Sequence, residues 1–184
     1  MISTTTAVRK APCLRAIDKS WCREYIDRMK TTPAGPPRTR QKSPARQTVS
    51  CGTLVVNPAG QLLLCHVTHT AHWDIPKGMQ DPGETTLEAA MRELHEEAGA
   101  AFPAERFIDL GGFEYRRDKR LHLYRVEAGA DLVTLETLVC TSFFPHHISG
   151  IMTPETDGFR WATREEVARL CWPRMAALLA TIAW

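Results

Sequence analysis

The chain has 184 residues, which suffices for one folded domain with a sizeable core. Its formal net charge of +2 hides an asymmetry, because residues 1–50 carry eleven Lys/Arg against three Asp/Glu and residues 51–184 carry twelve against eighteen. There is no apolar run of about 18 residues, no hydrophobic segment after Met1 and no C-x-x-C pair among the six cysteines, so we expect a cytoplasmic protein with reduced thiols and no membrane contact.

Residues 1–47 form a basic arm with two parts. Apolar residues recur at helical spacing between Leu14 and Met29, which predicts an amphipathic helix over about residues 14–29. This helix would pack on the body or on a second subunit, so a homodimer is one expected assembly. Residues 31–46 are rich in Pro, Thr and Arg, as is typical of a linker. The charge of the arm would attract RNA or polyphosphate, or would serve solubility alone.

The folded body is expected over residues 48–184. Residues 49–56 and 61–69 are apolar and β-branched enough to predict two strands, joined by a turn at Asn57–Gly60. Cys51 and Cys65 fall inside these strands and are expected to be buried. Residues 72–77, with the sequence HWDIPK, lead directly into the next segment.

A helix is predicted between Thr85 and Gly99. Thr85 and Glu88 have the spacing of a capping box, and Gly99 suits the left-handed position that ends a helix. At about 100° per residue, one face is apolar and a carboxylate arc is expected on the opposite side. The arc consists of Glu93, Glu96 and Glu97. Like charges at this spacing destabilise a helix, and a bound Mg²⁺ or Mn²⁺ would reverse that cost because carboxylate oxygens are preferred ligands of both ions.

The remaining elements alternate between strands and helices. Residues 106–111 and 138–145 are predicted to be strands, residues 113–126 a hairpin, and residues 146–152 a loop. The tip of the hairpin carries four cations, namely Arg116, Arg117, Lys119 and Arg120. Thr163 and Glu166 form a second capping box that starts a helix, and Pro173 is expected to start the last one.

The stretch from Gly78 to Ala100 resembles the box that defines the Nudix family, G-x5-E-x7-R-E-U-x-E-E-x-G-U, where U is aliphatic. Only Ala100 is smaller than the usual residue. The resemblance implies an α/β fold, the Nudix α/β/α sandwich with a mixed β-sheet between helices. It also implies a Mg²⁺- or Mn²⁺-dependent pyrophosphohydrolase. The positions that match the box are Gly78, Glu84, Arg92, Glu93, Leu94, Glu96, Glu97, Gly99 and Ala100.

The resemblance also assigns roles to residues of the box. It implies that Glu93 and Glu97 coordinate metal directly, that Glu96 does so directly or through water, and that the carbonyl of Gly78 supplies a further oxygen. Glu84 and Arg92 would form the ion pair that holds the loop against the helix. Glu96 is the first candidate for the general base.

Flanking segments resemble particular Nudix subgroups. Residues 73–78, WDIPKG, are similar to the strand before the box in dinucleoside polyphosphate hydrolases, where Lys77 would reach a phosphate and Trp73 would stack on a base or pack in the core. Tyr115 lies at a distance from the box that is typical of diadenosine polyphosphate hydrolases. Residues 153–161, TPETDGFRW, resemble a segment of bacterial RNA 5′-pyrophosphohydrolases. This makes Glu155 a further carboxylate at the metals and the second candidate for the base.

The predicted substrate is therefore a nucleoside diphosphate linked to another moiety, most of all a dinucleoside polyphosphate such as diadenosine tetraphosphate. Triphosphorylated RNA, which would lose pyrophosphate from its 5′ end, is the next candidate, followed by diphosphoinositol polyphosphates and single nucleotides. Arg117 and Lys119 are expected to bind the phosphates. A non-catalytic nucleotide sensor and an RNA-binding protein dominated by the arm are the alternatives from other classes.

Overall fold

The computed structural model describes residues 47–129 and 134–184. The predicted arm therefore lies outside the described residues except for Gln47, and so do its helix and linker. The described part contains a seven-stranded sheet, three α-helices, two short 3-10 helices and a separate two-stranded hairpin. Among the described residues, no helix has the length and apolar character that crossing a membrane requires.

The sheet is mixed, as predicted. Its order is β3-β2-β1-β6-β5, with β4 paired to β1 and β9 paired to β2. β1 and β6 run parallel along their whole length, and the other pairs are antiparallel. The strands are β1 (Thr48–Val56), β2 (Leu62–Val67), β3 (Trp73–Asp74), β4 (Lys77–Met79), β5 (Ile108–Arg116), β6 (Lys119–Glu127) and β9 (Thr156–Ala162).

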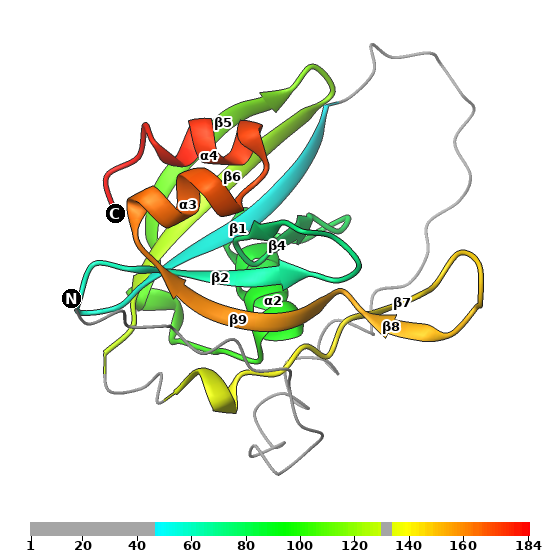
Figure 1. Cartoon of the computed structure of the whole chain (residues 1–184). Coiled ribbons are helices and arrows are strands. Elements are labelled where there is room, and N and C mark those ends of the chain that lie inside the picture. The colour runs from blue at the N-terminus through cyan, green and yellow to red at the C-terminus, as the bar shows by residue number, and fades with distance from the viewer. Residues whose placement is uncertain (1–46, 130–133) are drawn as a thin grey trace, which may run out of the picture. The chain divides into compact units, whose positions relative to one another are not determined.

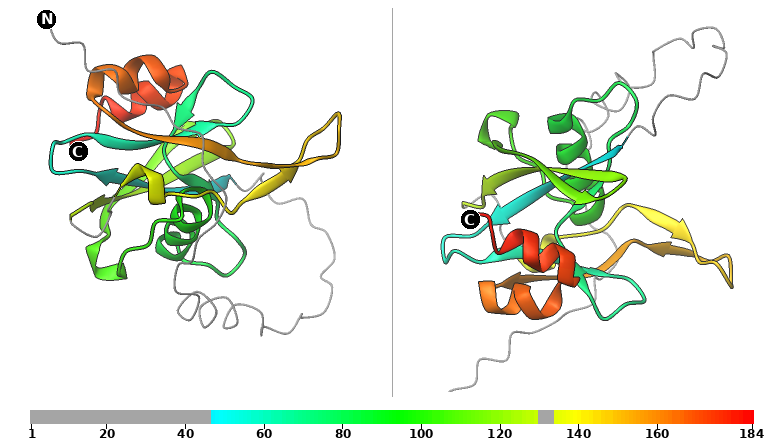
Figure 2. Two further views of the ribbon diagram at one scale, coloured as in Figure 1. Left: turned by 60° about the horizontal axis from the view of Figure 1, so that its bottom comes forward. Right: turned by 90° about the horizontal axis from the view of Figure 1, so that it is seen from above.

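Helices cover both faces of the sheet. Figure 1 and the left view of Figure 2 place α2 (Thr86–Ala98) on one face and the pair α3 (Arg164–Leu170) and α4 (Pro173–Leu179) on the other. Short 3-10 helices occupy Ala104–Arg106 and Leu135–Thr137, and β7 (Phe143–Pro145) pairs with β8 (Met152–Pro154). The predicted α/β/α sandwich is thus confirmed.

Alternation along the strands explains the two cores. Successive strand side chains point to opposite faces, so Leu54 and Leu64 pack with Met175 of α4, whereas Val55 and Leu63 pack with Leu94 of α2. Each of these side chains is fully buried, and full burial of a large aliphatic side chain contributes about 1.5–3 kcal/mol. Cys51 and Cys65 are also fully buried, as predicted.

The predicted turn and the closing helices are confirmed. Asn57 Oδ1 accepts hydrogen bonds from the backbone N–H groups of Ala59 and Gln61, which closes the turn between β1 and β2. Thr163 and Glu166 form the expected capping box at the start of α3, and Pro173 is the first residue of α4.

Two strand predictions were wrong. Residues 106–111 are not a separate strand, because β5 runs unbroken from Ile108 to Arg116 after a 3-10 turn and absorbs two register shifts against β6. Residues 138–145 form a strand only over Phe143–Pro145. In the rest of that segment, the N–H of Val139 bonds to Ala98 O and the N–H of Thr141 bonds to Glu96 O. These contacts satisfy carbonyls at the C-terminus of α2, which lack partners within the helix.

Candidate active site

The capped helix α2 positions the carboxylates. Thr85 is its N-cap in a reciprocal capping box with Glu88, and Gly99 ends it with φ of 66° in the left-handed region, both as predicted. A side chain at Gly99 would also place its Cβ 2.8 Å from the carbonyl oxygen of Val139. The two ends of the helix are therefore fixed by local contacts, which sets the register of the side chains between them.

The expected position of the carboxylate arc requires correction. Glu93 and Glu97 are buried, each with 8% of its surface exposed, whereas Glu96 is partly exposed. The arc therefore faces the protein and does not lie opposite the apolar stripe. The reason is angular: at 100° per residue, Glu97 lies only about 20° around the helix from Ala90, which is fully buried.

Arg92 connects four groups around the site. Its Nε and Nη2 bond to the two oxygens of Glu84 at 2.7 and 3.0 Å, and Nη2 also donates to Met79 O at 2.8 Å. Its Nη1 donates to Glu93 at 2.7 Å and to Glu96 at 3.0 Å. These contacts use all five N–H donors of the guanidinium. Hydrogen bonding to Glu84, the largest cause, raises the pKa of Arg92.

The loop and the helix are thereby joined, as the family resemblance implied. Burial would raise the pKa of Glu84, but hydrogen bonds from Arg92 and from the Asp81 N–H outweigh it and lower this pKa. Glu84 therefore stays ionised, and the charge-assisted pair with Arg92 holds the segment before α2 against the helix.

Gly78 of β4 makes close approach to Glu93 possible. A Cβ at position 78 would lie 2.1 Å from Glu93 Oε1, which is far inside van der Waals contact. Burial raises the pKa of Glu93, although Arg92 opposes the effect. Position 78 must therefore be glycine if this carboxylate is to reach the end of the strand.

Glu97 is the most perturbed carboxylate of the site. Its Oε2 accepts a hydrogen bond from the Lys77 N–H at 3.2 Å. Burial, the largest cause, raises its pKa to about 8; Lys77 opposes the shift, and Glu93 and Glu155 add to it. The hydroxyl of Thr156 donates to Glu97 O at 2.7 Å and ties β9 to the helix.

Glu155 approaches this site from the other end of the chain. It lines a cavity of about 340 Å³ together with Glu97, Lys77 and Asp74. Its backbone is anchored on two sides, because its carbonyl accepts from the Thr68 N–H and its own N–H donates to Ser142 O. The structure thus brings Glu155 to the box carboxylates across almost sixty residues of sequence.

Lys77 forms an ion pair with a carboxylate that the sequence reading did not single out. Its Nζ lies 2.8 Å from Asp74 Oδ2, and Asp74 Oδ1 accepts from the Ile75 N–H at 2.9 Å. Burial opposes ionisation of Lys77, but Asp74 and Glu97 raise its pKa. The spacing of three residues between Asp74 and Lys77 was the only available signal, and nothing in it distinguished this pair from a surface ion pair.

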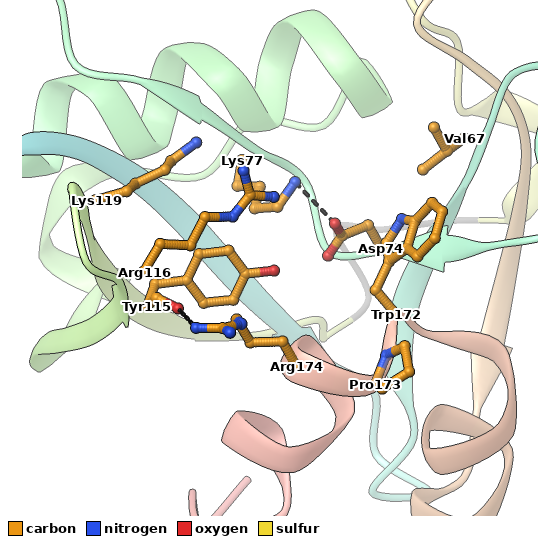
Figure 3. A pocket seen from close by; sticks show the side chains of 9 residues that line it. All are labelled: Val67, Asp74, Lys77, Tyr115, Arg116, Lys119, Trp172, Pro173 and Arg174. Atoms are coloured by element: carbon orange, nitrogen blue, oxygen red, sulfur yellow. Dashed lines mark hydrogen bonds and ion pairs between the residues drawn. The ribbon is translucent and has the colours of Figure 1, made fainter.

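A larger cleft of about 880 Å³ adjoins this pair (Figure 3). It shares Val67, Asp74 and Lys77 with the smaller cavity. The rest of its lining comes from the β5–β6 hairpin and from the start of α4, namely Tyr115, Arg116, Lys119, Trp172, Pro173 and Arg174. The two cavities are therefore neighbours that meet at Lys77.

The predicted substrate-binding residues divide into two groups. Lys77, Tyr115 and Lys119 line the cleft, whereas Arg117 and Arg120 do not. Arg117 is exposed at the hairpin tip, and Arg120 pairs with Glu114 at 3.3 Å. Trp73 does not suit the stacking role, because it is 6% exposed, belongs to the core and contacts the ring of His66. The exposed tryptophan of the cleft is Trp172, which sequence reasoning missed together with Arg174.

The residues present fit a divalent cation. Two buried carboxylates with raised pKa values favour a neighbouring positive charge, and the missing side chain at Gly78 lets the Glu93 carboxylate lie directly against the backbone there. Within residues 47–129 and 134–184, no three acidic, His or Cys side chains are already grouped around one point. Glu93 and Glu96 instead contact Arg92, and Glu97 accepts from the Lys77 N–H.

The chain is similar to known proteins in sequence and in fold. A model of the NUDIX domain matches residues 46–182. The asymmetrical bis(5′-nucleosyl)-tetraphosphatase of Rattus norvegicus is 52% identical over 42 residues, which are 23% of this chain and 27% of that protein. The RNA pyrophosphohydrolase of Serratia proteamaculans is 29% identical over 118 residues, 61% of this chain and 67% of that protein.

The shorter matches cover a small part of their proteins. A putative 8-oxo-dGTP diphosphatase of Bacillus subtilis is 46% identical over 46 residues, 25% of this chain and 31% of that protein. Among solved structures, the MutT NUDIX hydrolase of Burkholderia pseudomallei has a TM-score of 0.56 at 18% identity, over 75% of this chain and 99% of that one. This structural likeness supports the fold.

Proposed function

The chain belongs to the Nudix family, and from this premise we propose that it is a divalent-cation-dependent pyrophosphohydrolase of dinucleoside polyphosphates such as diadenosine tetraphosphate. The observation that carries the proposal is the placement of two buried carboxylates next to a lysine that lines a cationic cleft: Glu97 accepts from the Lys77 N–H, and Glu93 lies against the neighbouring Gly78. Hydrolysis of a diphosphate linkage requires charge neutralisation more than covalent chemistry, and this arrangement supplies the residues for it.

Glu93 and Glu97 would hold the cation, with Glu96 and the carbonyl of Gly78 as further ligands. Mg²⁺ or Mn²⁺, when bound, supplies positive charge to the phosphates and makes an attacking water more acidic. Arg92 and Glu84 keep the loop before α2 in register with the helix. Lys77, held by Asp74 at 2.8 Å, places one fixed positive charge where the two cavities meet.

Glu155 is the better-placed candidate for the general base. It shares a cavity with Glu97 and Lys77, whereas Glu96 is engaged by Arg92 at 3.0 Å. A base must reach the proton that it removes, within hydrogen-bond distance or through one water. The Glu155→Gln variant should therefore lose at least about a hundredfold in kcat, and Glu96→Gln should lose less.

The decisive experiment is a substrate panel assayed with and without Mg²⁺. The wild type should hydrolyse diadenosine tetraphosphate and release nucleotide products, and Glu97→Gln should lower kcat by at least about a hundredfold while the protein stays folded. Full activity in excess EDTA would show that hydrolysis does not depend on a divalent cation. A better rate with ADP-ribose than with diadenosine tetraphosphate would overturn the substrate assignment.

Removal of pyrophosphate from triphosphorylated RNA is the second candidate. It is favoured by the resemblance of residues 153–161 to bacterial RNA 5′-pyrophosphohydrolases and by the longer match to the Serratia protein of that name. A triphosphorylated oligonucleotide belongs in the same panel, because a higher kcat/KM on RNA than on the dinucleotide would favour this candidate.

A further inference from the structure

The cleft next to the box carboxylates holds an excess of positive charge from two distant parts of the chain. Arg116 and Lys119 come from the β5–β6 hairpin, and Arg174 comes from α4. The one acidic residue that lines the cleft, Asp74, is already paired with Lys77. Within the described residues, no acidic side chain lies within 4.0 Å of the charged groups of Arg116, Lys119 or Arg174.

Arg174 is fixed in place by the backbone. Its Nη1 donates to Tyr115 O at 2.6 Å, which leaves the other N–H groups of the guanidinium for a ligand. In the view of Figure 3, Arg116 and Arg174 lie on either side of the Tyr115 ring, whose hydroxyl points toward the middle of the cleft. An arginine held in this way loses little conformational freedom on binding a phosphate.

The cations also influence one another. Burial lowers the pKa of Lys119, and the neighbouring charges of Lys77 and Arg116 lower it further. Positive charges that repel each other in a cleft are stabilised by an anion that lies between them. The ligand that suits the cleft therefore carries more negative charge than a single diphosphate linkage.

An aromatic surface lies across the cleft from the hairpin. Trp172, the residue before α4, has 41% of its surface exposed. His72 packs against it with ring centroids 3.6 Å apart, which supports the indole. A nucleobase can stack on an exposed aromatic side chain, and Trp172 lines the same cleft as the three cations.

From this arrangement, we propose that Arg174, Arg116 and Lys119 bind the distal phosphates of a dinucleoside polyphosphate and that Trp172 stacks on its second base. The proposal rests on the proposed hydrolase function, because the scissile linkage would lie at Glu97 and Glu155 in the smaller cavity. The chain of phosphates would then pass Lys77, which both cavities share. Arg174 and Trp172 would determine specificity without taking part in bond cleavage.

The test compares diadenosine tetraphosphate, adenosine 5′-tetraphosphate and ADP-ribose as substrates. Arg174→Gln keeps an amide donor for Tyr115 O but removes the charge. It should raise KM about tenfold for both tetraphosphates, which corresponds to about 1.4 kcal/mol, with kcat within about twofold and ADP-ribose unaffected. Trp172→Ala should raise KM for diadenosine tetraphosphate alone, because only that substrate carries a second base.

Arg120→Gln is the matched control, since it removes the same charge from the hairpin outside the cleft. The KM increase of Arg174→Gln should be larger at low salt, where screening is weak. If Arg174→Gln kept the wild-type KM values, or if its KM rose equally for all three substrates, the proposed subsite would be wrong. If Arg174→Gln raised KM for triphosphorylated RNA but not for diadenosine tetraphosphate, the proposed ligand of the subsite would be wrong. If the wild type hydrolysed none of these substrates with Mg²⁺, the proposed function itself would fail.

Discussion

Replacement of Arg92 by lysine tests whether the network around the box depends on geometry or only on charge. The guanidinium makes five contacts, four of them to carboxylate oxygens of Glu84, Glu93 and Glu96. Lysine keeps the charge but has three donors on a single nitrogen, so it cannot bridge both oxygens of Glu84 and reach Glu93 as well. The variant therefore removes the two-pronged contact while the net charge stays constant.

The expected loss follows from burial. The side chains of Glu84 and Arg92 are 6% and 17% exposed, so water cannot replace the lost partners fully. A hydrogen bond to a charged group contributes about 1.5–3 kcal/mol. Because lysine retains some contacts, we expect Arg92→Lys to lower the free energy of unfolding by about 2–4 kcal/mol. For a domain of this size, each kcal/mol shifts Tm by about 2–4 °C, so Tm should fall by roughly 5–15 °C.

Denaturant unfolding in EDTA measures the stability, and turnover of diadenosine tetraphosphate in Mg²⁺ measures the effect on the site. We expect kcat to fall together with stability, since Glu84 would no longer hold the loop against α2. Arg120→Lys is the control: its contact with Glu114 is 3.3 Å long and exposed, so its free energy of unfolding should change by less than about 0.5 kcal/mol. If Arg92→Lys behaved like this control, the reasoning about bidentate geometry would be wrong.

Three further outcomes are expected. Gly78→Ala should destabilise the protein by about 1–3 kcal/mol and reduce activity, because the added Cβ would lie 2.1 Å from Oε1 of Glu93, which is buried and held by Arg92. Gly112→Ala should be nearly neutral by the same denaturant assay, because its Cβ would lie 3.2 Å from the end of the exposed Arg120 side chain and 3.7 Å from His122. Burial raises the pKa of Glu97 in the folded protein to about 8, well above its value in the unfolded chain. The folded state therefore binds this proton more tightly, and the metal-free wild type should lose at least about 1 kcal/mol in free energy of unfolding between pH 5 and 8, whereas Glu97→Gln should not show this loss. Parallel pH profiles of unfolding for the two proteins in EDTA would contradict this. Millimolar Mg²⁺ should raise the Tm of the wild type, and an equal rise in Glu97→Gln would argue against coordination by this residue.

The sequence by itself determined the features that depend on neighbours along the chain. The bounds of α2 could be read from Thr85, Glu88 and Gly99, because capping and a left-handed terminus involve contacts within a few residues. The resemblance to the Nudix box, which lies within one continuous segment, singled out Glu93, Glu96 and Glu97 as candidate metal ligands and implied the ion pair of Glu84 with Arg92 that the structure contains. The apolar strand segments likewise predicted that Cys51 and Cys65 are buried, whereas the mixed sandwich was implied by the family resemblance.

Tertiary structure decided the features that depend on partners far along the chain. Glu97 is buried because β4 and β9 cover that side of α2, through Lys77 and Thr156, and helical periodicity alone does not specify what covers a face. The segment after Leu138 likewise bonds to the C-terminal end of α2 rather than to a strand, and its local sequence does not specify that partner. The cleft itself joins Tyr115 to Arg174 across 59 residues. No local pattern singled out Arg174, the phosphate ligand that we propose, because its position in the cleft follows only from the packing of α4 and from the Tyr115 carbonyl that holds its guanidinium.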